Sequence, residues 1–206
     1  MSGFLEGVRA VAEATRAHAD ELNRLDGYAG DGDLGVTMTS AAAAVLALLP
    51  DMDGKQPADV LSACSLAIAR EAPSTAGTLV ATGLLRAAAA CRHDEGEFPP
   101  VSTLLAAAAE GIAERGRADV GSKTMLDALM PAAAAANEPA ATTAAALAAA
   151  ATAADAGAAA TTTMTARFGR ASWLAERSAG HEDAGARLVA IMLAAAAARA
   201  AGDRST

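Results

Sequence analysis

Aromatic side chains are nearly absent from this sequence: they make up 2% of its 206 residues, as one tryptophan, one tyrosine and three phenylalanines. Hydrophobic residues nevertheless reach 53%, and alanine supplies most of them. A protein interior is filled to high density, and small side chains achieve this only when the backbones lie close together. The composition therefore excludes a core of large interlocking rings and predicts a core of closely approaching helices.

Positive charge and cysteine are also scarce. Sixteen lysines and arginines face 24 aspartates and glutamates, which gives a net charge of −8 at pH 7. This excess argues against a protein that binds the phosphate backbone of nucleic acid, although a nucleotide can still bind through a bridging divalent cation. The two cysteines, Cys64 and Cys91, form no CxxC pair, so we expect reduced thiols rather than a redox or metal site.

The sequence offers no clear targeting signal and no convincing membrane span. Its first 22 residues carry acids throughout, which is typical of a helix rather than of a signal peptide. The run 144–160 is apolar, but alanine makes it weakly hydrophobic and Asp155 interrupts it, so we do not expect it to cross a membrane. We expect one cytoplasmic domain over residues 1–206, long enough to bury a core.

Strong helix formers fill the chain, and no stretch shows sustained alternation of β-branched residues, which predicts an all-α fold. Glycine, proline and polar residues cluster at the breaks between the helical stretches. We expect the polar, glycine-rich breaks to converge at one end of the bundle. The breaks delimit eight predicted helices, at residues 3–24, 35–49, 57–71, 75–93, 100–117, 123–136, 138–166 and 184–201.

The stretch "LDGYAGDGDLG", residues 25–35, places Asp26, Asp31 and Asp33 among four glycines. Glycine permits tight turns, so carboxylates at this spacing can fold back toward one point. Three hard oxygen ligands in an open loop suit Mg²⁺. The alternative is a solvated turn in which Asp31 or Asp33 caps the next helix. An EF-hand is excluded, because alanine or threonine stands where its bidentate glutamate would be.

The stretch "GRADVGSKT", residues 116–124, is close to a phosphate-binding P-loop but does not match it. Ser122 separates Gly121 from Lys123, and no predicted strand precedes the stretch. Two interpretations stay open. Lys123, one of only two lysines in the chain, contacts an anion, or the stretch is a plain loop with Ser122 as the helix N-cap.

A third polar stretch, "FGRASWLAERSAGHEDAGA", spans residues 168–186 and gathers Arg170, Arg177, His181 and Asp183. A hydrolase relay of Ser178, His181 and Asp183 is not expected, because residues so close in sequence rarely form one and no nucleophile elbow is present. We interpret His181 as a polar loop residue rather than as a metal ligand.

Taken in order, "LNRLDGYAGDGDLGVTM", "GSKTMLDALMPA" and "GRASWLAERSAGHEDAGA" resemble the nucleotide-binding domain of dihydroxyacetone kinases. This domain is the L subunit of the bacterial three-part enzyme and the C-terminal domain of the single-chain ATP-dependent kinases. The resemblance covers nearly the whole chain. It implies an eight-helix antiparallel barrel with the nucleotide site in loops at one end, and phosphotransfer to dihydroxyacetone or a similar small ketose.

The same resemblance implies a ligand set, although it assigns no catalytic residue. Two Mg²⁺ ions would be bound by Asp26, Asp31 and Asp33 and would bridge to the phosphates of ADP or ATP. Arg170 would reach the phosphates from the third stretch. The residues implied to lie at the nucleotide are Leu34, Gly35, Val36, Thr37, Thr75, Ala76, Gly116, Met125, Arg170, Asp183, Ala184 and Gly185.

In the subunit form of the family, the nucleotide is a tightly held coenzyme that a phosphotransfer protein rephosphorylates, while a partner subunit holds the ketose on its own histidine. In the single-chain form, ATP exchanges. We therefore expect a partner kinase subunit that carries the ketose, a phosphotransfer protein as one candidate donor, a homodimer as one candidate assembly, and no nucleic acid or membrane.

Three departures from the family pattern leave the donor, the partner and the ketose open, with erythrulose as one alternative. Leu34 replaces a histidine, "PSTAG" at residues 73–77 replaces a glycine-rich turn, and Ser122 replaces an acid. Two other function classes also stay open. One is a non-catalytic ADP-binding regulatory module, and the other is a helical barrel that carries a lipid or another apolar ligand.

Overall fold

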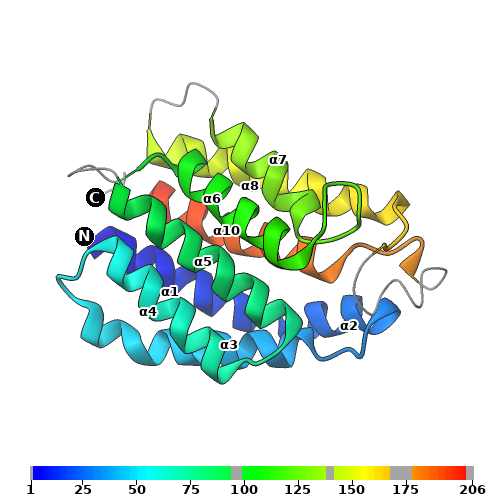
Figure 1. Cartoon of the computed structure of the whole chain (residues 1–206), viewed down its shortest axis with the longest axis horizontal. Helices are drawn as coiled ribbons and strands as arrows, with labels where there is room; N and C mark the ends of the chain where they lie inside the picture. Colours follow the sequence, from blue (N-terminus) through cyan, green and yellow to red (C-terminus); the bar gives the residue numbers. More distant parts are fainter. Residues whose placement is uncertain (1, 94–98, 138–141, 168–177, 203–206) are drawn as a thin grey trace.

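The computed structural model describes residues 2–93, 99–137, 142–167 and 178–202, and these ranges contain nine α-helices, two 3₁₀ helices and no strand (Figure 1). The α-helices are α1 (Ser2–Ala17), α2 (Ala19–Ala29), α3 (Leu34–Leu48), α4 (Pro57–Glu71), α5 (Thr75–His93), α6 (Val101–Gly116), α7 (Leu126–Ala136), α8 (Thr143–Ala160) and α10 (Ala184–Gly202). The 3₁₀ helices are η1 (Leu49–Met52) and η2 (Thr161–Thr163).

Eight of the helices close into a barrel. Each packs against the next in the order α1, α3, α4, α5, α6, α7, α8 and α10, and α10 returns to α1. The short helix α2 contacts α1, α3 and α10 and covers one end of the ring. The predicted eight-helix barrel is therefore confirmed, with α2 added to it.

The first predicted helix, 3–24, is wrong in its extent. The chain breaks at His18, where φ is −102° and ψ is 17°, and α2 then runs on to Ala29. Leu22 and Leu25 continue the apolar spacing and are buried, which stabilises α2 beyond the predicted end. Asp26 consequently lies on the last turn of a helix and not in a loop.

Two later boundaries also differ from the prediction. Helix α7 begins at Leu126 rather than 123, because the Asp127 carboxylate accepts hydrogen bonds from Gly121 N–H and Thr124 N–H and holds the preceding residues in a turn. Helix α8 begins at Thr143, capped by the Thr142 hydroxyl, which accepts from Ala145 N–H at 3.1 Å. It ends at Ala160 rather than 166, where η2 follows.

Close helix packing is confirmed at the contact of α7 with α8. Ala128, Ala132, Ala150 and Ala154 are fully buried there. A Cβ atom added at Gly157 would lie 2.3 Å from the backbone oxygen of Asp127, so the two backbones touch. Small side chains at these positions are what allows such an approach.

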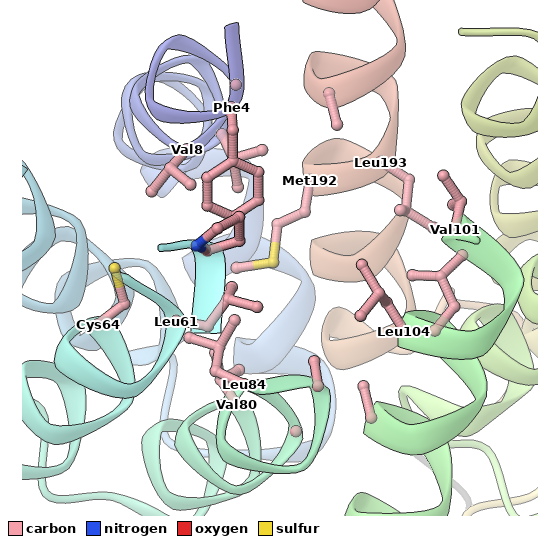
Figure 2. Close-up of a pocket in the computed structure, with 18 of the residues that line it drawn as sticks. Phe4, Val8, Leu61, Cys64, Val80, Leu84, Val101, Leu104, Met192 and Leu193 are labelled. Atoms are coloured by element: carbon pink, nitrogen blue, oxygen red, sulfur yellow. The ribbon is translucent and has the colours of Figure 1, made fainter. Parts of the chain in front are cut away.

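A cavity of about 1240 Å³ lies inside the barrel and is lined mainly by apolar side chains. Figure 2 shows Phe4, Leu61, Leu84 and Met192 turned into this space from helices on different sides. Cys64 lines the same cavity, and burial raises the pKa of its thiol to about 11, so the thiol stays protonated and unreactive.

Three stretches of the described chain are long and apolar enough to cross a membrane by length and composition alone: Leu34–Met52, Thr143–Thr163 and Ala184–Gly202. The second includes the run 144–160, which was not expected to cross a membrane because it is only weakly hydrophobic. In the fold, all three form walls of the barrel, each packed between neighbouring helices.

Candidate functional site

The three predicted aspartates meet at the end of the barrel that α2 covers. Asp26 comes from α2, and Asp31 and Asp33 come from the turn between α2 and α3. Each offers a carboxylate oxygen, and these atoms lie within 4.8 Å of one another. Asp31 and Asp33 are exposed and Asp26 is half-buried. Three negative charges at this spacing repel one another, and an oxygen-rich, solvent-accessible cluster is the donor set that Mg²⁺ prefers.

The turn that carries the acids wraps around the Asp26 carboxylate. Its Oδ2 accepts hydrogen bonds from Gly32 N–H at 2.8 Å and from Asp33 N–H at 3.1 Å. Gly32 adopts a φ of +75°, which favours glycine. A Cβ atom added at Gly30 would lie 2.3 Å from Asp26 Oδ1. The glycines thus let the backbone close tightly on the first aspartate.

Asn23 sets the start of α3 and was missed in the sequence. Its Oδ1 accepts hydrogen bonds from Gly35 N–H at 2.7 Å and Val36 N–H at 3.2 Å. A Cβ atom added at Gly35 would lie 1.9 Å from the Ala19 carbonyl oxygen, so Gly35 is where α2 and α3 touch. No local capping motif signals this contact, because the partners lie 12 and 13 residues apart.

A pocket of about 270 Å³ opens beside the aspartates, between the connections at this end of the barrel. Most of the predicted site residues line it: Asp26, Asp33, Leu34, Thr37, Thr75, Ala76, Gly116, Met125, Asp183, Ala184 and Gly185. Asp31, Gly35 and Val36 do not, and the Val36 side chain is 60% exposed. Arg170 lies outside the described residues.

The turn before α5 supplies one wall of the pocket. Ser74 caps this helix: its hydroxyl accepts from Gly77 N–H at 3.0 Å, and its carbonyl accepts from Thr78 N–H at 2.9 Å. Thr75 and Ala76 form the first turn of α5 and face the pocket. The first turn of a helix offers backbone N–H groups and a partial positive charge, both of which favour an anion such as phosphate.

Neither open interpretation of the stretch 116–124 is borne out. The Lys123 ammonium does not reach for an external anion, because four backbone carbonyl oxygens surround its Nζ at 2.7–3.2 Å and the residue is only 4% exposed. Burial lowers the pKa of Lys123, and the charge of Asp183 opposes this. Ser122 is not the N-cap of α7, where Thr124 and Asp127 supply the capping hydrogen bonds.

The ring of His181 stacks on the ring of Tyr28, with centroids 3.4 Å apart and planes inclined by 3°. Both residues line the pocket, so the stack joins α2 to the segment that precedes α10. The sequence predicts only a polar loop residue at His181, and no local pattern points to Tyr28. The pair is 153 positions apart in the chain, which leaves no local signal.

Asp183 caps α10 and faces the pocket. Its Oδ1 accepts from Ala186 N–H at 2.7 Å, and its own N–H donates to the Thr161 hydroxyl at 2.8 Å. Burial raises the pKa of this carboxyl to about 7, and the neighbouring charge of Asp127 adds to the effect. Hydrogen bonds from the backbone and the charge of Lys123 act in the opposite direction.

Arg187 holds the same turn from the outside and was also missed. Its guanidinium binds both carboxylate oxygens of Glu182, at 2.7 Å each, and Asp155 Oδ1 of α8 at 2.7 Å. The side chain is 19% exposed, so this fork is partly shielded from water. It ties the pocket-lining turn to α8 in a fixed geometry.

Comparison with known proteins agrees with this architecture. The DAK2 domain family model matches residues 28–198. The ADP-binding subunit DhaL of the PEP-dependent dihydroxyacetone kinase of Escherichia coli is 32% identical over 179 residues, which cover 85% of each chain. The D-erythrulose kinase of Mycolicibacterium smegmatis is 38% identical over 191 residues, 88% of this chain and 32% of that protein.

Among solved structures, the chain is similar to a dihydroxyacetone kinase. The dihydroxyacetone kinase of C. freundii superposes with a TM-score of 0.78 at 26% identity, over 96% of this chain and 34% of that one. A second structure of that kinase, in complex with AMP-PNP and Mg²⁺, has a TM-score of 0.78 at 25% identity. The chain thus spans about a third of the erythrulose kinase and of the solved kinase.

Proposed function

The chain belongs to the DAK2 domain family, and from this premise we propose that it is the Mg²⁺–nucleotide-binding phosphotransfer subunit of a kinase for dihydroxyacetone or a related small ketose. We propose this role for a single domain over residues 1–206. The observation that carries the proposal is the juxtaposition of Asp26, Asp31 and Asp33, with oxygens within 4.8 Å, and a pocket bordered by the first turns of α3 and α5. These are the parts that a Mg²⁺–polyphosphate requires.

In this proposal the chain's residues bind and orient the nucleotide. The three aspartates would hold two Mg²⁺ ions, and these ions would supply positive charge that neutralises the phosphates and so favours phosphoryl transfer. The stretch from Leu34 to Thr37 lies along the nucleotide through Leu34 and Thr37, which line the pocket, and Thr75 and Ala76 face the phosphates. We propose that Gly116 and Met125 border the adenine and that the turn Asp183–Gly185 closes the site. For Arg170, which lies outside the described residues, we propose a contact with the phosphates.

The ketose is held by a partner. The E. coli relative, which this chain matches over 85% of its length, is named as the ADP-binding subunit of a PEP-dependent dihydroxyacetone kinase. We propose a separate subunit that carries the ketose, a phosphotransfer protein that rephosphorylates the bound nucleotide, a homodimeric assembly, and a cytoplasmic location without nucleic acid or membrane. The likeness to a D-erythrulose kinase makes erythrulose the alternative substrate. The AMP-PNP bound to the similar C. freundii kinase makes ATP the alternative donor.

Two measurements test this function. Mass spectrometry of the denatured protein should identify co-purified ADP or ATP, and calorimetry should show nucleotide binding that requires Mg²⁺. A coupled assay with and without a ketose-carrying subunit then separates a kinase subunit from a non-catalytic regulatory module. Turnover that appears only with that subunit supports the kinase; binding without turnover under all conditions supports the module.

The apolar cavity of about 1240 Å³ favours a second role, in which the barrel carries a lipid or another apolar ligand. Alanine, leucine, valine and methionine side chains provide no polar partner for water over most of its wall. Organic extraction of the purified protein followed by mass spectrometry tests this role. An amphiphile recovered in stoichiometric amount supports it, and an extract without one counts against it.

A further inference from the structure

We propose that the Lys123 ammonium is a built-in monovalent cation that organises one wall of the nucleotide pocket, which makes Lys123 a positioning residue rather than a ligand of the nucleotide. This inference rests on the function proposed above. Lys123 Nζ lies 2.8 Å from the Thr161 oxygen, 3.2 Å from the Met164 oxygen, 2.8 Å from the Ser178 oxygen and 2.7 Å from the His181 oxygen.

The coordination is that of a dehydrated cation. An ammonium group has three protons, yet four backbone carbonyl oxygens surround this one. Carbonyl cages replace the hydration shell of small monovalent cations such as K⁺. Lys123 is 4% exposed, so the carbonyl dipoles substitute for water here.

The cage joins two segments that are far apart in the chain. Two carbonyls belong to η2 and the residues just after it, and two belong to residues 178 and 181, which precede α10. From this second segment, the His181 ring stacks on Tyr28 and Asp183 N–H bonds to the Thr161 hydroxyl. The position of the ammonium therefore sets where this wall stands against the aspartate-bearing helix α2.

The backbone at Lys123 is consistent with a requirement for its side chain. Its φ is +62°, in the left-handed region that favours glycine. Glycine would relieve this backbone strain, so lysine is present here in spite of the backbone and not because of it. The same fact makes Lys123→Gly a suitable variant, because it empties the cage without straining the chain.

The test is chemical rescue. Mg²⁺–ADP affinity of Lys123→Gly is measured by calorimetry at equal ionic strength in ammonium, potassium or tetramethylammonium chloride. We expect binding at least tenfold weaker than wild type in tetramethylammonium, which is too large for the cage, and at least threefold recovery in ammonium or potassium. The wild type should bind equally in all three salts. Lys123→Met, whose neutral side chain takes the space of the lysine side chain, should lose affinity without rescue.

Lys55→Ala removes the other lysine of the chain, which is exposed and lies beyond the far end of α3, and should match the wild type in every salt. The proposal is overturned if either Lys123 variant binds Mg²⁺–ADP as the wild type does, or if the loss in Lys123→Gly is the same in all three salts.

A second readout needs no nucleotide. The Tm of Lys123→Gly should be higher in ammonium chloride than in tetramethylammonium chloride, and the Tm of the wild type should be the same in both. A Lys123→Gly variant that folds in none of the salts counts against the proposal. If the wild type binds no nucleotide, the proposed function fails, while this Tm comparison still decides whether the cage takes a cation.

Discussion

The pocket at the loop end of the barrel measures about 270 Å³ and is bordered by aspartates, glycines and helix first turns, whereas the cavity inside the barrel measures about 1240 Å³ and is lined mainly by apolar side chains. In the middle of a helix the backbone satisfies its own hydrogen bonds, so the inner wall can be apolar throughout. At helix ends, N–H groups and turns are available for polar ligands. One fold thus provides two environments, and a substitution should affect one with little effect on the other.

The largest predicted effect is a loss of nucleotide binding at the acidic end that leaves the barrel folded. Asp31→Asn or Asp33→Asn should abolish Mg²⁺-dependent ADP binding, because each removes a carboxylate from a cluster whose oxygens lie within 4.8 Å. The fold should be retained and the Tm of the ligand-free protein unchanged or slightly raised, because repulsion among the acids is relieved. Calorimetry and circular dichroism measure both quantities.

Asp51→Asn is the matched control, because Asp51 is exposed and follows α3 at the opposite end. It should bind Mg²⁺–ADP as the wild type does. Undiminished ADP affinity in both Asp31→Asn and Asp33→Asn would rule out the metal site.

Substitutions at the barrel cavity should do the reverse, lowering stability and leaving nucleotide binding unchanged. Leu61→Ala enlarges the cavity from α4 and should lower the free energy of unfolding by about 2–5 kcal/mol. Leu61→Met keeps the volume and should cost less than about 1.5 kcal/mol. Denaturant titration gives these values. Below the melting transition, both variants should bind Mg²⁺–ADP with wild-type affinity. A loss of binding free energy as large as the loss of unfolding free energy would show that the two regions are coupled.

A smaller effect is expected at Arg170, which belongs to the third polar stretch of the sequence. The planar guanidinium bonds phosphate oxygens in a way that lysine cannot reproduce. Arg170→Lys should therefore weaken nucleotide binding or phosphoryl transfer about tenfold or more, which corresponds to roughly 1.5–3 kcal/mol. Affinity and Tm are measured on the same variant. A lower Tm with unchanged affinity would assign Arg170 to the scaffold instead.

A pH dependence is also expected from Asp183. Burial raises the pKa of this carboxyl from its usual 3.8 to about 7, so the folded state holds the proton more tightly than the unfolded state does. The stability that this group contributes is fully present below pH 3.8 and is lost as the pH rises through about 7. The difference in unfolding free energy between the wild type and Asp183→Asn should decline over that pH range. A difference that does not change with pH would contradict the raised pKa.

The sequence was a good guide wherever the signal was local. Glycines and acids in "LDGYAGDGDLG" indicated a turn that gathers three carboxylates, and Thr75 does begin a helix at the pocket. Family resemblance led to the barrel and to the DAK2 domain family, and both are confirmed.

The contacts that complete the pocket could not be found in this way. Asn23 bonds the start of α3, Lys123 bonds oxygens 38 to 58 positions away, and Tyr28 meets His181 from the other end of the chain. Each depends on the closed ring of helices, which brings distant connections to one end. The break at His18 was also missed, because the apolar spacing continues through it into α2.

The acidic cluster and the adjoining pocket together form one Mg²⁺–nucleotide site in the function proposed above. The most direct measurement is the Tm in four buffers: without ligand, with Mg²⁺, with ADP and EDTA, and with Mg²⁺ and ADP together. Each ligand neutralises the charge of the other, and binding to the folded state raises its stability by mass action. If the two parts form one site, the Tm shift with both ligands far exceeds the sum of the separate shifts. An equal shift from ADP with Mg²⁺ or with EDTA would show that they do not.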